Sequence, residues 1–482
     1  MNYPIVIRVL GSLLIFESLG MIPSLLVSLY YGQNDSKAFI LSILITGILG
    51  LIMYKTPTRI KRIKSREALS IVSVGWVLVS FFGALPLVLS GSVPSWFDAF
   101  FEMVSGFTTT GATVIGDVEA LPQGILFWRS FSHWIGGMGI LVFTVAILPA
   151  FGVGSFQIFK AESPGPTADR IVPRIKDTAK ILYTVYFIVT IIQIVFLKIG
   201  GMSFYDSLVY TFGTVGTGGF ATKNASVGAY HSSYVNYIIS IFMILSGISF
   251  SLYYQMYKGR LREGIKNEEL KLYLVIVSAS VLLITLNIAK SNYGSLGKAF
   301  EHALFQVGSI ITTTGYSTAD FDQWPTFSKA ILFLLMFVGG CAGSTAGGIK
   351  NIRILVLLKL IRREMAKIFH PRAIIHVKVN DRVLSGDVLA SITSFFALYI
   401  IIFVLATIVV SLEGVGLVSA SSSVAATLNN VGPGFDFVGP TRNFGEYGNA
   451  SKMLFSFLML FGRLELFTML MLFNPKFWTD EI

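Results

Sequence analysis

Long apolar segments separated by short polar connections dominate the sequence. Crossing a hydrocarbon core of about 30 Å takes roughly 20 helical residues. Ten apolar runs reach that length, near residues 5–30, 36–54, 69–91, 127–152, 179–200, 235–257, 271–289, 327–349, 385–412 and 452–473. The pattern predicts an all-α polytopic membrane protein in a lipid bilayer, with about ten membrane spans.

A second kind of apolar segment is about a dozen residues long, too short to span, and occurs four times. Each copy leads into a turn of hydroxyl or small residues that contains a glycine. Ser95 and Ser203 each stand three residues before an aspartate at the start of such a segment, a spacing that resembles a capping box and predicts a helix start. We interpret the segments as half-helices that descend part-way into the membrane and return through the turn, although an ordinary external loop is the alternative.

Spacing of the turn glycines indicates internal repetition. Gly111, Gly219, Gly315 and Gly432 follow one another at intervals of 108, 96 and 117 residues. Repetition on this scale normally reflects structural symmetry. The predicted architecture is two leading helices followed by four pseudo-repeats of helix, half-helix, glycine turn and helix around a central pore. The segments are 1–68 for the leading helices and 69–158, 159–262, 263–358 and 359–482 for the repeats.

Composition and charge agree with this picture. With 54% hydrophobic and 13% charged residues, the chain is too apolar for a water-soluble protein of its size. Four loops, 55–66, 160–180, 258–271 and 350–382, hold 25 of the 37 Lys and Arg residues. Such loops remain in the cytoplasm, which predicts that both termini lie there too. The net charge of +11 therefore reflects membrane topology, and we expect no nucleic-acid partner.

The turns are suited to binding a cation. Rings of backbone carbonyls can replace the water around an ion, and glycine allows the conformations that point carbonyls inward. The half-helices would direct their negative carboxyl ends at the same axis. The candidate ion-binding residues are Thr109, Thr110, Gly111, Thr217, Gly218, Gly219, Thr313, Thr314, Gly315, Asn430, Val431 and Gly432. Acidic residues follow three turns and would attract cations to an outer mouth, or simply keep a loop soluble: Asp117, Glu119, Asp320, Asp322 and Asp436.

A second repeated position lies in the span after each turn. It reads Gly136-Gly137, Ser246-Gly247, Gly339-Gly340 and Gly462-Arg463. An arginine inside a span usually faces protein or a wet cavity. We predict that Arg463 projects into the pore below the turns, and the alternative is a structural pair with Glu17 or Glu465.

The third repeat is expected to be the one with a broken helix beneath its turn. Ten successive residues there form helix poorly, and we predict a gate at Gly339, Gly340, Cys341, Ala342, Gly343, Ser344, Thr345, Ala346, Gly347 and Gly348. Close helix packing by small residues is the alternative. The basic segment that follows is a candidate contact for a regulator.

Five motifs resemble those of the TrkH subfamily of the Trk/Ktr/HKT superfamily of potassium transporters, across essentially the whole chain. They are Thr-Thr-Thr-Gly at 108–111 and 312–315, Gly-Thr-Gly-Gly-Phe at 216–220, Asn-Asn-Val-Gly-Pro-Gly at 429–434 and Ser-His-Trp-Ile-Gly-Gly-Met-Gly at 132–139. The two leading spans are also a feature of this subfamily.

The resemblance implies that Gly111, Gly219, Gly315 and Gly432 are selectivity-filter glycines for K⁺, the transported ion, that 339–348 is an intramembrane gating loop and that Arg463 is the pore arginine. It also implies a bacterial plasma membrane, a homodimer and a cytosolic TrkA-type nucleotide-binding regulatory subunit. The chain contains no Gly-x-Gly-x-x-Gly after a strand, so we expect no organic cofactor in it and place nucleotide control in a partner.

Two other function classes compete with a channel-like pore. A sodium- or proton-coupled symporter commonly uses intramembrane carboxylates, and Glu17 and Glu465 are the clear candidates in the middle of spans. A membrane-embedded enzyme would need clustered catalytic or metal-binding groups, but the five histidines are scattered. We therefore favour ion conduction and expect no enzyme.

Overall fold

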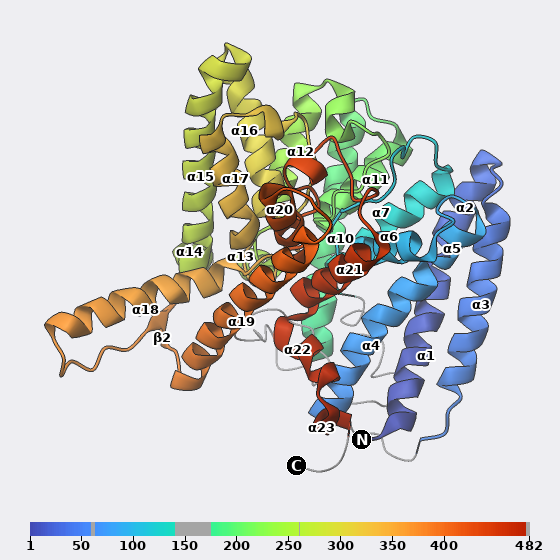
Figure 1. The fold of residues 1–482 in the computed structure, drawn as a ribbon, viewed down its shortest axis with the longest axis horizontal. Helices are drawn as coiled ribbons and strands as arrows, with labels where there is room; N and C mark the ends of the chain where they lie inside the picture. The colour runs from blue at the N-terminus through green and yellow to red at the C-terminus, as the bar shows by residue number, and fades with distance from the viewer. Residues whose placement is uncertain (59–62, 140–174, 260, 479–482) are drawn as a thin grey trace.

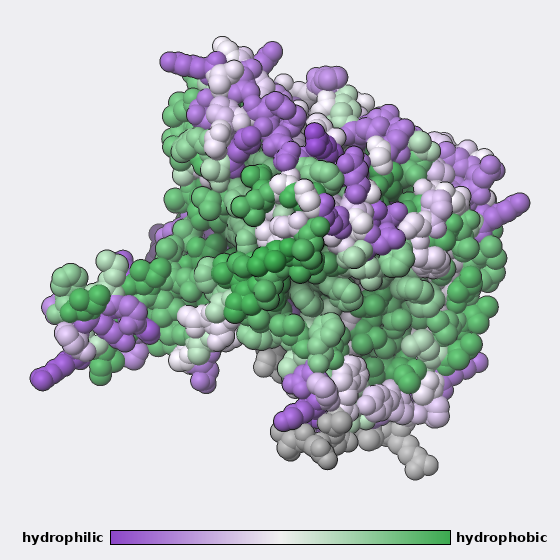
Figure 2. Space-filling view, in the orientation of Figure 1, coloured by the Kyte–Doolittle hydropathy of each residue, from purple (hydrophilic) through white to green (hydrophobic). Residues whose placement is uncertain are grey.

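A computed structural model describes residues 1–58, 63–139, 175–259 and 261–478. Within these ranges six helices are long and apolar enough to cross a membrane, and a bent pair adds a seventh candidate. Hydrophobic side chains cover the middle of the face in Figure 2, while hydrophilic ones gather along its upper rim and lower edge. The predicted spans 327–349 and 452–473 coincide with shorter helices. Span 127–152, the repeat boundary at 158/159 and most of loop 160–180 lie partly or wholly outside the described residues, so the number of ten stays a prediction.

The leading hairpin packs against the first repeat (Figure 1). It consists of α1 (Tyr3–Gly20), α2 (Ile22–Tyr31) and α3 (Ser36–Tyr54). α1 and α3 cross closely at two glycines, because a Cβ on Gly11 would lie 2.7 Å from the Gly50 carbonyl oxygen. Tyr3 and Trp478, near the two ends of the described chain, meet at the lower end of the molecule, where the Tyr3 hydroxyl donates to the Trp478 carbonyl at 3.2 Å.

Each repeat contains a first helix, a half-helix and a second helix. In the first repeat these are α4 (Ser65–Gly83) with α5 (Leu85–Leu89), α6 (Trp96–Phe107) and α7 (Gln123–Gly137). In the second they are α10 (Ile175–Ile199), α11 (Phe204–Val215) and the pair α12 (Ser233–Ser246) and α13 (Phe250–Tyr257), with η2 (Ser226–Tyr230) before α12.

The third repeat has α14 (Leu261–Lys266), α15 (Glu268–Ile288), η3 (Ala289–Tyr293), α16 (Leu296–Ile311), η4 (Phe321–Gln323), α17 (Thr326–Val338) and α18 (Asn351–Phe369). The fourth has α19 (Gly386–Ser411), α20 (Leu417–Leu428), η5 (Asp436–Val438), α21 (Asn449–Leu464), α22 (Leu466–Leu470), η6 (Met471–Phe473) and α23 (Pro475–Trp478). Between them, β1 (Lys378–Val379) and β2 (Arg382–Val383) form an antiparallel pair. α18 projects away from the body in Figure 1.

The predicted starts of the half-helices are confirmed. The Ser95 hydroxyl accepts the backbone N–H of Asp98 at 3.4 Å at the start of α6, and Ser203 accepts that of Asp206 at 3.0 Å at the start of α11. Each serine satisfies one of the N–H groups that a helix leaves without an internal partner. The short polar motif therefore determines where the chain turns back into the apolar layer.

The expectation that the third repeat alone has a broken second helix is wrong. In the second repeat the α12–α13 pair bends by 89° between Ser246 and Phe250. In the fourth, α21 stops before Glu465, whose φ is 69°. These breaks coincide with the repeated glycine position, where a small residue or a positive φ interrupts helical hydrogen bonding. The third repeat differs in the length of its break, which extends from α17 to α18.

Candidate functional site

The four turns share one backbone conformation. Their first residues, Thr109, Thr217, Thr313 and Asn430, have φ of 57°, 55°, 57° and 56°. Their glycines, Gly111, Gly219, Gly315 and Gly432, have φ of 78°, 79°, 84° and 99°. The left-handed region costs an L-residue roughly 1–2 kcal/mol, and a β-branched threonine adopts it rarely. Three threonines there mark a strained conformation that the surrounding structure maintains.

Each turn also forms the carboxyl-terminal cap of its half-helix. The middle residue of each turn donates its N–H to the helix five residues earlier: Thr110 to Ser105, Gly218 to Gly213, Thr314 to Ser309 and Val431 to Ala426, at 2.9, 2.7, 2.8 and 2.8 Å. This is the hydrogen bond of a Schellman motif, in which a residue in the left-handed conformation ends an α-helix. The negative end of each half-helix dipole is therefore directed at its turn.

The turns form a closed ring. A Cβ on Gly111 would collide with the carbonyl oxygen of Gly218, one on Gly219 with that of Thr314, and one on Gly315 with that of Val431. One on Gly432 would lie 2.6 Å from the carbonyl oxygen of Thr110, which returns to the first turn. Each turn glycine thus lies against the next turn, at the carbonyl of the residue that directly precedes the glycine of that turn. The fourth glycine lies against the first turn in the same way. All twelve predicted ion-binding residues belong to this ring.

Loop 339–350 connects α17 to α18 and contacts the ring. Its Gly347 N–H donates to the Thr313 hydroxyl at 2.6 Å, and its Gly348 N–H donates to the Asn429 carbonyl at 3.0 Å. The Thr345 hydroxyl donates to the Val215 carbonyl at the end of α11, at 3.0 Å. The loop therefore touches the ends of three half-helices, and it contains all ten residues predicted as a gate.

Arg463 lies between the ring and loop 339–350. Its guanidinium donates to the Thr109 hydroxyl at 3.2 Å and to the Thr345 carbonyl at 2.9 Å. It also donates to the carbonyls of Gly136 and Gly137, at 2.5 and 2.8 Å. One side chain thus connects the first turn, the second helix of the first repeat and loop 339–350.

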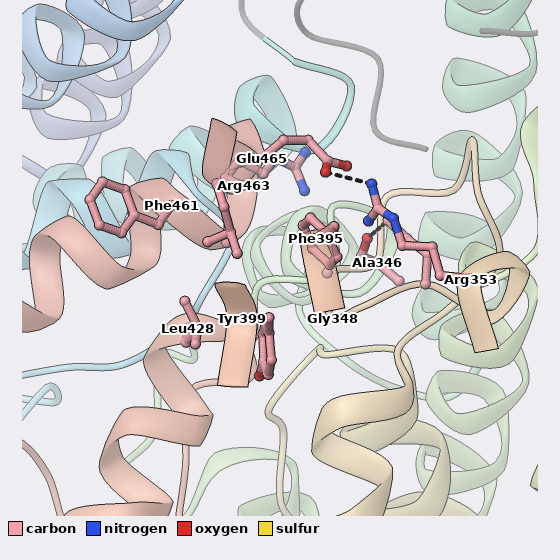
Figure 3. A pocket seen from close by; sticks show the side chains of 13 residues that line it. Ala346, Gly348, Arg353, Phe395, Tyr399, Leu428, Phe461, Arg463 and Glu465 are labelled. Atoms are coloured by element: carbon pink, nitrogen blue, oxygen red, sulfur yellow. Dashed lines mark hydrogen bonds and ion pairs between the residues drawn. The ribbon is translucent and has the colours of Figure 1, made fainter. Parts of the chain in front are cut away.

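The alternative to a pore-facing Arg463 is an ion pair with Glu17 or Glu465. Glu465 forms an ion pair with Arg353 at 2.5 Å (Figure 3), and Arg353 in turn lies over the Phe395 ring, 3.9 Å from its centroid. These residues line a pocket between loop 339–350, α19 and the break after α21. The carboxylate of Glu17 lies beside Gly83 instead, and no described residue donates a hydrogen bond to it.

The predicted acidic residues lie in the segments after the turns, and several of them take part in local hydrogen bonds. Asn224 donates to Asp117 at 2.8 Å, and this hydrogen bond lowers the pKa of Asp117 from its ordinary value. The Asp322 carboxylate accepts the backbone N–H of Asp436 at 2.6 Å. These carboxylates therefore hold the segments that follow the turns of neighbouring repeats together, as well as adding negative charge.

Comparison with known proteins identifies the architecture. A family model described as TrkH, cation transport protein, matches residues 32–480. The chain belongs to the TrkH family. It is 38% identical to the Trk system potassium uptake protein TrkH of Halomonas elongata, over 99% of this chain and all of that one. It is 39% identical to the protein of the same name from Salmonella typhimurium, over the full length of both.

A solved structure agrees with the sequence relatives. The crystal structure of the potassium transporter TrkH from Vibrio parahaemolyticus matches with a TM-score of 0.89 and 36% identity, over 99% of this chain and all of that one. The resemblance to the TrkH subfamily and the helical membrane fold predicted from the sequence are confirmed. The chain is a multi-pass membrane protein of a family of transporters.

Several buried carboxylates of this TrkH-family chain were missed in the sequence, among them Glu102 and Glu269. Only Glu17 and Glu465 were counted within spans, but Glu102 on α6 is fully buried and pairs with Arg129 at 2.5 Å. Glu269, 8% exposed in the first turn of α15, accepts the N–H groups of Ala342 and Ile352 at 2.7 and 3.0 Å. A charge within an apolar segment was the available signal, yet its partners are distant in sequence.

Proposed function

We propose that this chain conducts K⁺ across a bacterial plasma membrane through the ring of four turns. The single observation that carries the proposal is the closed ring, in which each glycine faces the carbonyl before the next glycine. Carbonyl oxygens can replace the hydration shell of K⁺ without adding fixed charge. Four half-helix ends add negative potential at the same place.

Control of conduction would belong to the layer beneath the ring. Loop 339–348 and Arg463 together contact all four repeats, which supports a role as a gate in the closed position. The guanidinium would also repel cations on the axis. α18 projects from the end of the loop and is a candidate contact for a cytosolic TrkA-type nucleotide-binding subunit (Figure 1).

Assembly and orientation follow the same proposal. Tyr3 and Trp478 lie together at one end of the molecule, which supports both termini being on one side of the membrane, proposed to be the cytoplasm. The names of the relatives refer to a Trk system, which supports a partner subunit. We also propose a homodimer, with K⁺ as the transported ion.

A sodium- or proton-coupled symporter is the second candidate, and Glu17 is the observation that favours it. Its carboxylate is buried, without a hydrogen-bond donor among the described residues. Glu102 and Glu269 are less suitable for coupling, because both already accept hydrogen bonds from the protein. A carboxylate that exchanges a proton or sodium ion must be able to release its partners.

The test is flux into proteoliposomes with a K⁺ gradient as the only driving force. We expect K⁺ uptake without a sodium or proton gradient, and the same uptake from the variant Glu17→Gln. Uptake that requires either gradient and disappears in Glu17→Gln would replace the channel with the symporter.

A further inference from the structure

The second turn differs from the other three at its middle residue. Thr110, Thr314 and Val431 carry β-branched side chains, whereas the second turn has Gly218. The φ of Gly218 is not positive, so backbone conformation does not require glycine there. The requirement is space, because a Cβ on Gly218 would collide with the imidazole ring of His133.

His133 belongs to the preceding repeat. It lies on α7, three residues before the Gly136-Gly137 pair, and it is completely buried. The corresponding positions of the other repeats, also three residues before the repeated pair, are Met243, Met336 and Met459. A junction is the position three residues before the repeated pair in the second helix of one repeat, together with the middle residue of the next turn. By sequence, three junctions have a methionine and a β-branched residue, and the first has a histidine and a glycine.

Hydrogen bonds fix the imidazole between the two repeats. The Phe220 N–H, directly after Gly219, donates to His133 Nε2 at 3.2 Å. Nε2 must therefore accept, so the proton lies on Nδ1, which donates to the Gly106 carbonyl of α6 at 2.7 Å. The neutral ring thus joins the first half-helix to the exit of the second turn.

Phe220 is held at its ring by His133 and Arg129 and at its backbone carbonyl by Tyr316. Its ring centroid lies 4.2 Å from that of His133, and the guanidinium of Arg129 stands 4.1 Å from it. Its carbonyl accepts the Tyr316 hydroxyl at 3.1 Å, and Tyr316 directly follows the third turn glycine. Displacement of His133 would therefore be transmitted to the second and third turns.

We propose that His133 is a positioning residue of the second turn and determines ion selectivity. It supplies from the first repeat the packing that Thr110, Thr314 and Val431 supply within their own turns, and it adds a hydrogen bond that a methionine cannot make. The inference rests on the proposed function, because it assumes that the ring selects K⁺. Gly218 then provides the space that the His133 ring occupies.

The experiment exchanges the junction in two steps and measures the K⁺/Na⁺ permeability ratio of the full-length protein in proteoliposomes. Gly218→Thr alone places a side chain against the imidazole, and we expect the ratio to fall about tenfold or more. His133→Met alone removes the hydrogen bond to Phe220, and we expect a fall of about fivefold, the factor that corresponds to one neutral hydrogen bond. The double variant restores the packing of the other junctions but not the hydrogen bond, so we expect a fall of no more than about fivefold, instead of the roughly fiftyfold fall that two independent effects would give together.

Recovery in the double variant is the result that a general loss of packing would not produce. A double variant as impaired as the two single effects combined would overturn the proposal, as would single variants with the wild-type ratio. If His133→Met does not give a monodisperse protein, His133→Gln retains one donor and one acceptor and should keep the ratio within about threefold of the wild type. A loss beyond tenfold there would also contradict it.

Gly315→Ser separates this inference from the proposed function. If the wild type has no preference for K⁺, the proposed function fails, and the inference fails with it. If the wild type prefers K⁺ and Gly315→Ser loses that preference while the His133 and Gly218 variants keep it, only the role of His133 is rejected.

Discussion

The ring of turns is symmetric, whereas the layer beneath it, made of loop 339–350, Arg463 and the ends of the second helices, is not. In the ring, four repeats adopt one backbone conformation, with glycine φ between 78° and 99°. In the layer beneath, each repeat contributes something different: Gly136 and Gly137 carbonyls, a bent helix, a long loop and an arginine. Under the proposed function, an ion site built from equivalent oxygens requires the symmetry of the ring, whereas a gate that changes state does not require symmetry in the layer beneath.

Removing the loop should have the largest effect, because it tests the unequal layer directly. Deletion of Ala342 to Gly347 removes the hydrogen bonds that Gly347 donates to Thr313 in the third turn and that Thr345 donates to Val215 at the end of α11. A closed state favoured by about 3 kcal/mol would then be lost, and we expect basal K⁺ flux to rise on the order of 100-fold. Rubidium uptake into proteoliposomes without any partner protein measures it. A folded deletion variant with wild-type flux would reject the gate.

A substitution in the ring should change selectivity and leave gating unaltered. Gly315→Ser introduces a Cβ that collides with the Val431 carbonyl at a residue with φ of 84°. We expect the K⁺/Na⁺ permeability ratio to fall about tenfold, as one misplaced carbonyl oxygen would cause. Gly91→Ser is the matched control, because Gly91 has φ of 72° but nothing within 4 Å of its Cβ position. An equal effect of both variants would mean that backbone strain alone explains the result.

Arg463→Ala should raise flux by less than the deletion does. It removes hydrogen bonds to the first turn and to loop 339–350, and it also removes the positive charge near the axis. We expect a rise of about fivefold to tenfold in basal K⁺ flux. Arg463→Lys keeps the charge and loses the forked geometry, so it divides the effect into its two causes. A variant that only fails to fold, with no active fraction, would favour a structural role.

Glu269→Ala should give the smallest rise, about threefold, because it loosens the loop at two N–H groups without touching the ring. The adjacent carboxylate, Glu268, provides a control for which no change in flux is expected. Glu268 pairs with Lys359 near the surface, where its carboxylate is 39% exposed, so Glu268→Ala should leave basal flux unchanged. Equal rises in both variants would show that the whole start of α15 matters, not the carboxylate of Glu269.

Local chemistry explains what could be predicted. The half-helix starts at Ser95 and Ser203 are set by a hydroxyl that caps an N–H three residues later. The turn glycines are recognisable because a positive φ favours glycine, and the membrane class follows from apolar length. Each of these signals lies within a few consecutive residues.

The misses have a common origin as well. Glu102 was overlooked because its partner, Arg129, lies 27 residues away on another helix. The break after α21 was not foreseen, since the sequence around Glu465 lacks the run of small residues that marks the third repeat. A helix break compensated by distant hydrogen bonds leaves little trace in local propensity.

By itself, the sequence determined that four similar turns exist, which residues form them and that they lie in a membrane, because hydropathy, caps and glycine conformations are local properties. Only the tertiary structure decided which contacts each repeat makes with the others. The His133 ring lies against Gly218, 85 residues later, and Arg463 donates a hydrogen bond to the first turn across 354 residues. Such contacts depend on which surfaces meet after folding, and no periodicity along the chain encodes them.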